Sequence, residues 1–267
     1  MIPTFVTIII LLLVFSKKFR EGFILSLKYL PDFFESLVIK YKESVLKLSI
    51  LFILTSICID LLLVIFESIF NIPSTITWDF ISNFAGAMLL LILLRRAIKV
   101  LFGQTYFDLF KSNKKYFISF VIIILSILLV YGINYITHPI SLLLPTSEIF
   151  DEIRKEMLQK PQNHLEAILL FLSISIIPAF IEEIFFRGVL YQTIRRKYGV
   201  AFSTFLLTII FYLFHLDPQM IFFLTIGNLV LCLTYEYSKS LVIPFVIHAG
   251  INFSVLLFYM NGLIDKT

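Results

Sequence analysis

The sequence predicts an all-α polytopic membrane protein, a transmembrane bundle of about eight helices. Of its 267 residues, 59% are hydrophobic, and the mean hydropathy is +0.97; soluble domains contain roughly 45–50% apolar residues. The apolar residues occur in runs close to the ~20 residues that a helix needs to cross a bilayer. Backbone polar groups in lipid must be satisfied within the span, so these runs are expected to be helical. The expected spans are residues 2–16, 48–70, 79–95, 117–136, 165–187, 199–216, 219–236 and 241–261.

The distribution of basic residues predicts the orientation of these spans. Most of the 22 Lys and Arg residues lie in the first, third, fifth and seventh connections. Basic loops stay in the cytoplasm, so both termini are expected to face outward. The run 2–16 lacks a positively charged start and is followed by Lys17 and Lys18, which favours a retained anchor over a cleaved signal peptide. No linker or repeat divides residues 1–267, so we expect a single integral membrane domain.

The first connection carries more structure than a simple loop requires. Apolar residues recur at helical spacing among charged ones over residues 17–47, which indicates one or two amphipathic helices on the cytoplasmic surface, broken near Pro31. A solvated linker is the alternative.

In the second span, Asp60 is interpreted as a hydrogen-bonded acid facing the bundle interior, with substrate or ion handling as the alternative. Cys58 and Cys232 each lie in a span and are expected to be unpaired.

The stretch Ile181–Arg187 places two adjacent carboxylates and an arginine inside a hydrophobic run. Ionisable groups are expensive in a membrane, and they are functional candidates by default. Glu183 and Arg187 are four residues apart, the spacing at which helical side chains meet. This pairing would neutralise Glu183 and leave Glu182 free for acid–base chemistry.

Two further polar pairs follow at the same helical spacing. Phe211 and His215 lie on one face of the sixth expected span, and His248 and Asn252 on one face of the eighth. A lone histidine in a span often only bonds a backbone carbonyl. Several ionisable and amide side chains across neighbouring spans favour a site instead. Asn228, on the seventh span, is interpreted as a hydrogen bond between helices.

A turn is expected at Gly199, between the stretch that carries Glu182 and the helix that carries His215. Glu182 and His215 lie at nearly equal distances along the chain on either side of this glycine. In an antiparallel hairpin they are therefore level. A water molecule between them could be deprotonated and attack a peptide carbonyl, while His248 and Asn252 donate hydrogen bonds to the oxyanion.

Other chemistries find less support in the sequence. No serine or cysteine lies beside a base in these patterns, which disfavours a covalent nucleophile. A zinc site of His and Glu ligands is chemically feasible but not favoured, because HExxH is absent and Arg187 would repel a cation. We therefore expect no cofactor. No basic stripe with interleaved aromatic residues indicates nucleic-acid binding.

The three motifs, Glu182-Glu183-x-x-x-Arg187, Phe211-x-x-x-His215 and His248-x-x-x-Asn252, resemble those of the CPBP family. This family includes the CAAX-processing endopeptidases and the bacteriocin-processing and immunity proteins, formerly called Abi. The resemblance covers about residues 165–260. It implies a glutamate-type intramembrane protease in which Glu182 and His215 activate water, His248 and Asn252 form the oxyanion site, and Glu183 and Arg187 support it.

The resemblance does not specify the substrate, since members of the family act on prenylated CAAX tails, on peptide precursors or on unknown membrane proteins. We expect a membrane-associated protein or peptide, prenylated or a peptide precursor, in contact with membrane lipid. We expect a bacterial plasma membrane protein, with the endoplasmic reticulum membrane as the alternative. Two other functions stay open. One is a non-catalytic immunity or scaffold protein that binds a peptide or membrane partner, and the other is a proton-coupled transporter, since buried Glu and His also form proton relays.

Overall fold

The protein is described by a computed structural model that covers residues 29–40, 75–111, 116–141, 160–215 and 217–260, with short pieces between 42 and 63 and at 143–144. These residues contain helices, turns and irregular connections but no strand, so the predicted all-α class is confirmed for them. The chain divides into two compact units, residues 1–103 and 104–267. Each is described separately below.

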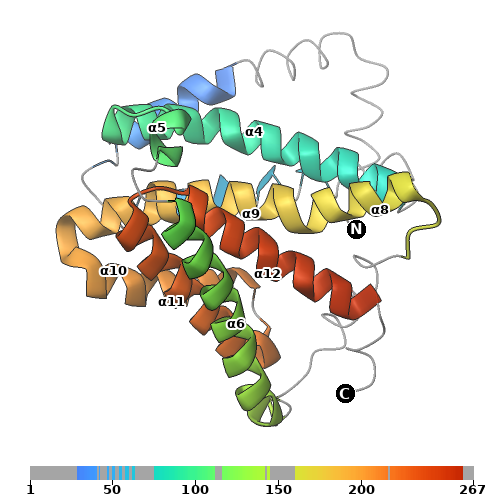
Figure 1. Ribbon diagram of the computed structural model, residues 1–267. Coiled ribbons are helices and arrows are strands. Elements are labelled where there is room, and N and C mark those ends of the chain that lie inside the picture. The colour runs from blue at the N-terminus through green and yellow to red at the C-terminus, as the bar shows by residue number, and fades with distance from the viewer. Residues whose placement is uncertain are drawn as a thin grey trace, which may run out of the picture. The chain divides into compact units, whose positions relative to one another are not determined.

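The principal helix of the first unit is α4, Ile76–Phe102 (Figure 1). Its N-terminus is capped by Thr75, whose hydroxyl accepts from the Trp78 N–H. Arg96 of α4 donates hydrogen bonds to Asp32 and Glu35 of a helical stretch over residues 29–40. The predicted amphipathic segment 17–47 falls only partly within the described residues and is not confirmed.

The second unit contains the stretch where the sequence motifs lie. Its helices, in chain order, are α5 (Tyr106–Phe110), α6 (Tyr116–Ser141), α8 (His164–Phe171), the π-helix η1 (Leu172–Ile176), α9 (Ile177–Glu182), the π-helix η2 (Glu183–Tyr191), α10 (Gln192–His215), the 3₁₀ turn η3 (Pro218–Met220), α11 (Ile221–Ser238) and α12 (Val242–Met260).

The predicted hairpin is centred on Gly199, which interrupts α10 with φ 79° and ψ 178°. Only glycine adopts this backbone conformation readily. The chain reverses there, and α10 packs against both η2 and α11. The second turn lies at Lys239, a left-handed residue between α11 and α12. The position predicted for the hairpin turn is therefore confirmed.

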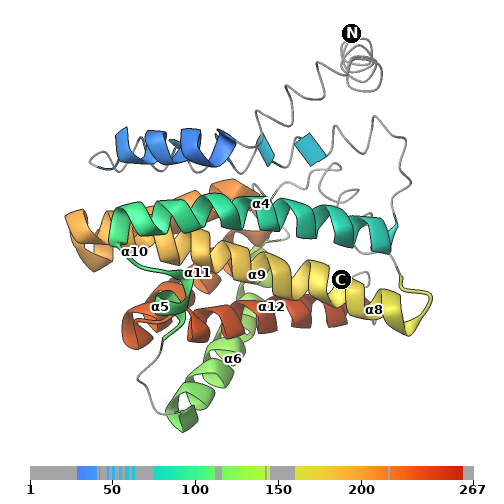
Figure 2. The ribbon, with the colours of Figure 1, turned by 90° about the horizontal axis from the view of Figure 1, so that it is seen from above.

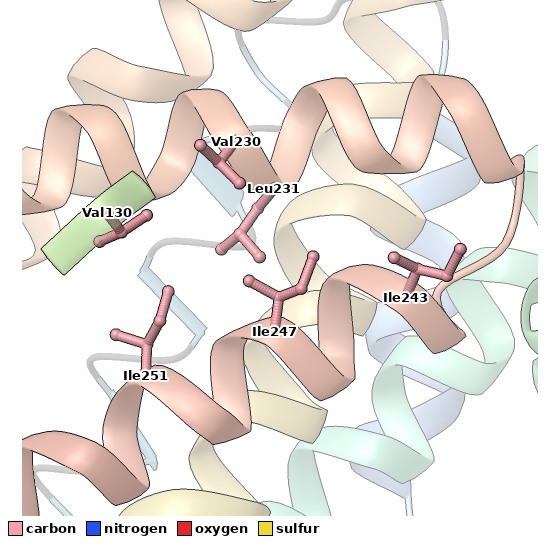
Figure 3. Packing of buried hydrophobic residues seen from close by; sticks show 6 residues of the cluster. All are labelled: Val130, Val230, Leu231, Ile243, Ile247 and Ile251. Atoms are coloured by element: carbon pink, nitrogen blue, oxygen red, sulfur yellow. The ribbon is translucent and has the colours of Figure 1, made fainter. Parts of the chain in front are cut away.

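The apolar core of this unit lies where α6, α11 and α12 meet. Figure 3 shows six buried side chains from these helices pointing toward one another, namely Val130, Val230, Leu231, Ile243, Ile247 and Ile251. The same α12 also runs beside η1 and α9 (Figure 2). One face of α12 thus packs in the core, and its neighbouring face lies against the helix that carries the two glutamates.

Three stretches among the described helices are long and apolar enough to cross a membrane, namely Ser119–Ile140, the bent run His164–His215 and Pro218–Ser238. The apolar part of α12, Val242–Leu257, is shorter. The chain is thus an integral membrane protein, but the predicted total of eight spans is not confirmed. The expected run 2–16 and Asp60 of the second span lie outside the described residues. Cys58 and Cys232 are both free, as predicted.

Candidate active site

The two glutamates lie at the junction between an α-helix and a π-helix. Glu182 is the last residue of α9, and Glu183 is the first of η2. The π-helix is a rare conformation that is frequent at functional sites. The sequence spacing predicted an α-helix throughout, yet the expected ion pair is present: the Arg187 Nη1 donates to the Glu183 Oε1 at 2.8 Å. Both side chains are fully buried.

A hydrogen-bonded chain extends from this ion pair to two other helices. The second guanidinium nitrogen of Arg187, Nη2, donates to the Asn228 Oδ1 on α11. The Asn228 Nδ2 donates to the Thr208 Oγ1 on α10 at 2.7 Å. Asn228 therefore bonds between helices, as predicted. An unpaired buried charge is costly, and these hydrogen bonds compensate for the burial of the Arg187 charge.

His248 of α12 completes the cluster from the opposite side. Its Nδ1 lies 2.8 Å from the Glu183 Oε1, the same oxygen that accepts from Arg187. Its Nε2 lies 3.7 Å from the Glu182 Oε2. His248 is buried, whereas the Glu182 side chain keeps 28% of its surface exposed. Glu183 thus holds the imidazole ring, and Glu182 faces its free nitrogen.

The Phe211 ring lies close to both histidines. Its centroid lies 4.7 Å from that of His215 and 6.1 Å from that of His248. The Arg187 guanidinium carbon lies 5.3 Å from the same ring, within cation–π range. This position explains why an aromatic residue precedes His215 by one helical turn.

His215 lies at the exposed end of α10. Its Nδ1 is 2.9 Å from the Phe211 carbonyl oxygen, which can only accept, so this nitrogen carries a proton, and in a neutral ring Nε2 is left as an acceptor. No hydrogen bond or ion pair within the described part of the chain joins His215 to Glu182. The structure therefore brings four of the six predicted residues together, namely Glu182, Glu183, Arg187 and His248, while His215 is linked to them through Phe211.

Asn252 contacts the π-helix η1. Its Nδ2 donates to the Ile174 carbonyl at 3.4 Å. In an α-helix the N–H of residue 178 would bond this carbonyl, but Pro178 has no N–H. The proline thus leaves an acceptor available to α12. The sequence patterns gave no indication of this contact.

Thr208 and the π-helical register were also missed by sequence reasoning. A threonine in an apolar helix usually bonds its own backbone, and Thr208 does donate to the Thr204 carbonyl. Its second role as an acceptor depends on the placement of α11.

Among the described residues, no three His, Cys, Asp or Glu side chains are grouped as metal ligands.

Together, the fold and the site define a helical membrane protein with a buried carboxylate–imidazole cluster. Residues 164–254 of the chain match the family model described as Rce1-like, type II CAAX prenyl endopeptidase. This segment is thus similar to the CAAX proteases, which agrees with the resemblance to the CPBP family and indicates a protease. All six predicted site residues lie inside the match. No curated protein and no solved structure matches the chain significantly.

Proposed function

We propose that the protein is an intramembrane endopeptidase of the type II CAAX kind, which uses an activated water molecule to hydrolyse a peptide bond. The observation that carries this proposal is the convergence of the first and third motifs. Glu182 and the His248 Nε2 face each other at 3.7 Å, and a separate carboxylate, Glu183, fixes the ring from behind. A purely structural cluster would not require the partly exposed second carboxylate.

Glu182 is the proposed general base. The Glu182 Oε2 has no hydrogen-bond partner among the described residues, and the side chain is partly exposed. It would take a proton from water as the water oxygen attacks the peptide carbonyl carbon. The same proton would then pass to the nitrogen of the leaving amine as the C–N bond breaks. The His215 Nε2, an acceptor, is suited to hold the same water.

His248 and Asn252 are the proposed donors to the oxyanion. The Nδ1–H of His248 donates a hydrogen bond to Glu183. The Nε2 can therefore donate only when the ring carries a second proton, as an imidazolium, and that cation would have carboxylates on both sides. Asn252 would offer its second amide hydrogen, since the Ile174 carbonyl takes one. Donors placed in a water-poor site stabilise developing charge strongly.

Lipid is the expected environment, and a membrane-associated protein or peptide is the expected substrate. The family match supports a prenylated CaaX tail as the first substrate to test, and a peptide precursor as the second. A bacterial plasma membrane stays our prediction for the location, with the endoplasmic reticulum as the alternative.

The test uses the purified full-length protein in lipid nanodiscs and a fluorogenic farnesylated peptide ending in a CaaX sequence. We expect cleavage by the natural protein, none by Glu182→Ala or His215→Ala, and equal accumulation of all three in membranes. Cleavage that survives a strong chelator would support the metal-free mechanism, whereas loss with chelator and rescue by zinc would overturn it. A physiological function that persists in a Glu182→Ala, His248→Ala double variant would support the immunity or scaffold alternative. Proton-coupled flux in proteoliposomes would support the transporter alternative.

A further inference from the structure

Asn228 and Thr208 lie outside the three sequence motifs, yet they form the far end of the hydrogen-bonded chain that reaches His248. Asn228 is fully buried on α11, and Thr208 is half-buried on α10. Resting on the proposed function, we propose that these two are positioning residues for the reaction. They hold the Arg187 guanidinium in the one orientation that leaves the Glu183 Oε1 available to His248.

Every hydrogen bond in this chain has a single allowed direction. Arg187 can only donate, so the Asn228 atom facing it is the carbonyl oxygen. The amide nitrogen of Asn228 therefore faces Thr208, and it also lies 3.7 Å from the Cys232 Sγ on its own helix. The Thr208 hydroxyl donates to the Thr204 carbonyl at 2.8 Å, and its oxygen is left to accept from Asn228. Because no member can reverse, the chain specifies the rotation of the Asn228 amide.

The Arg187 guanidinium is held at two points. Nη1 donates to Glu183 and Nη2 to Asn228, while Nε has no partner among the described residues. Of the two Glu183 oxygens, Oε1 accepts from both Arg187 and His248, and Oε2 has no partner among the same residues. The ion pair is therefore single, although arginine and carboxylate favour the bidentate fork.

Asn228 opposes closure of that fork. If its oxygen is withdrawn from Nη2, the guanidinium gains by turning both nitrogens toward the two Glu183 oxygens. A bidentate Arg187 would then compete with His248 for Oε1. The imidazole would lose the contact that orients its Nε2 toward Glu182, and small misplacements of catalytic groups reduce rates steeply.

Thr208→Val is the sharpest test, because it removes the nearer of the two acceptors of the Asn228 amide and leaves only the Cys232 Sγ at 3.7 Å. The substitution does not change Arg187, Glu183 or His248. Thr193→Val is the matched control: Thr193 is also half-buried on α10 and donates to the carbonyl four residues earlier, of Val189, at 2.8 Å. The assay is cleavage of the farnesylated CaaX peptide in nanodiscs, with kcat and KM determined separately. Thermal unfolding of each variant is measured in the same preparation.

We expect Thr208→Val to lower kcat by about tenfold or more with KM little changed, Thr193→Val to keep the natural kcat, and Thr208→Ser to restore it. Asn228→Asp keeps an oxygen for Arg187 but loses the donor to Thr208. Its kcat should lie between those of Thr208→Val and Thr193→Val. Equal kcat for Thr208→Val and Thr193→Val would overturn the proposal, as would a fall in kcat that only follows a lower unfolding temperature. Absence of cleavage by the natural protein, or full cleavage by Glu182→Ala, would instead refute the proposed function.

Discussion

The Nδ1 of His248 lies 2.8 Å from the Glu183 Oε1, a contact that joins residues 65 positions apart in the chain. The same oxygen accepts from Arg187. Glu183 therefore connects the helix of the first motif to the helix of the third. Its neighbour Glu182 makes no comparable bond to the described residues, and it faces the opposite nitrogen of the imidazole at 3.7 Å. Adjacent, identical residues are thus expected to have separate functions.

The buried Glu183–Arg187 pair should behave as one energetic unit. Replacing Glu183 by Gln or Arg187 by Met leaves an uncompensated buried charge, and each change is expected to cost about 3–5 kcal/mol of unfolding free energy. The double variant should cost clearly less than the sum of the two single changes. Denaturant unfolding in detergent micelles gives the unfolding free energy of the natural protein, the two single variants and the double variant. Strict additivity would show that the two charges do not interact.

Phe211→Leu should weaken the site. The ring contacts both histidines and the Arg187 guanidinium, and its loss is expected to cost about 1–2 kcal/mol of stability and to reduce cleavage. Phe205→Leu on the same helix is the control, because that side chain is 63% exposed. Equal effects of the two substitutions on cleavage would show that Phe211 only fills space.

Two glycines give opposite predictions for a substitution to alanine. Gly199 has φ 79°, so Gly199→Ala forces a side chain into a glycine conformation and should cost about 1–3 kcal/mol. Gly132 lies within α6, and an added Cβ meets no atom within 4 Å, so Gly132→Ala should add about 0.5–1 kcal/mol. Thermal unfolding separates them. A harmless Gly199→Ala would contradict the sharp hairpin.

Acid should weaken the short helix α5. Lys111 and Thr105 donate to the Asp108 carboxylate and hold the pKa of this group well below its usual range. A depressed folded pKa contributes stability that is present above the unfolded pKa, near 3.9, and that is lost as the pH falls below it. The Leu109 carbonyl of α5 accepts from the Leu241 N–H at the start of α12, so this loss reaches the helix that carries His248 and Asn252.

Asp108→Asn tests this pH dependence. The variant should unfold at a lower temperature than the natural protein at pH 7, and the difference should shrink as the pH is lowered below about 4. Circular dichroism melts over that range give the comparison. A difference that stayed constant with pH would assign the stabilisation to something other than the Asp108 charge.

The sequence predicted those features that depend on local spacing. The apolar runs predicted helices, Gly199 predicted the hairpin, and the interval between Glu183 and Arg187 predicted their ion pair. Asn228, as an amide in an apolar span, was correctly interpreted as an interhelical bond. Each of these depends on a residue's own chemistry or on one helical turn.

Other features depend on the tertiary structure. The π-helix η1 ends just before Pro178, which offers no N–H to the Ile174 carbonyl. The bond from His248 to Glu183 requires α12 to lie against α9 and η2, and no spacing in the sequence indicates it. The expected level positions of Glu182 and His215 are likewise not accompanied by a direct contact among the described residues. Whether a water molecule joins them stays a prediction.

The most direct test of the account compares Glu182→Gln with Glu183→Gln in one preparation. Both substitutions remove a carboxylate charge and keep the side-chain shape. The measurement is the rate of peptide cleavage together with the unfolding temperature of each protein. We predict that Glu182→Gln abolishes cleavage and unfolds at close to the natural temperature, whereas Glu183→Gln loses stability as well as activity. Cleavage by Glu182→Gln at the natural rate would contradict the assignment of Glu182 as the base that activates water.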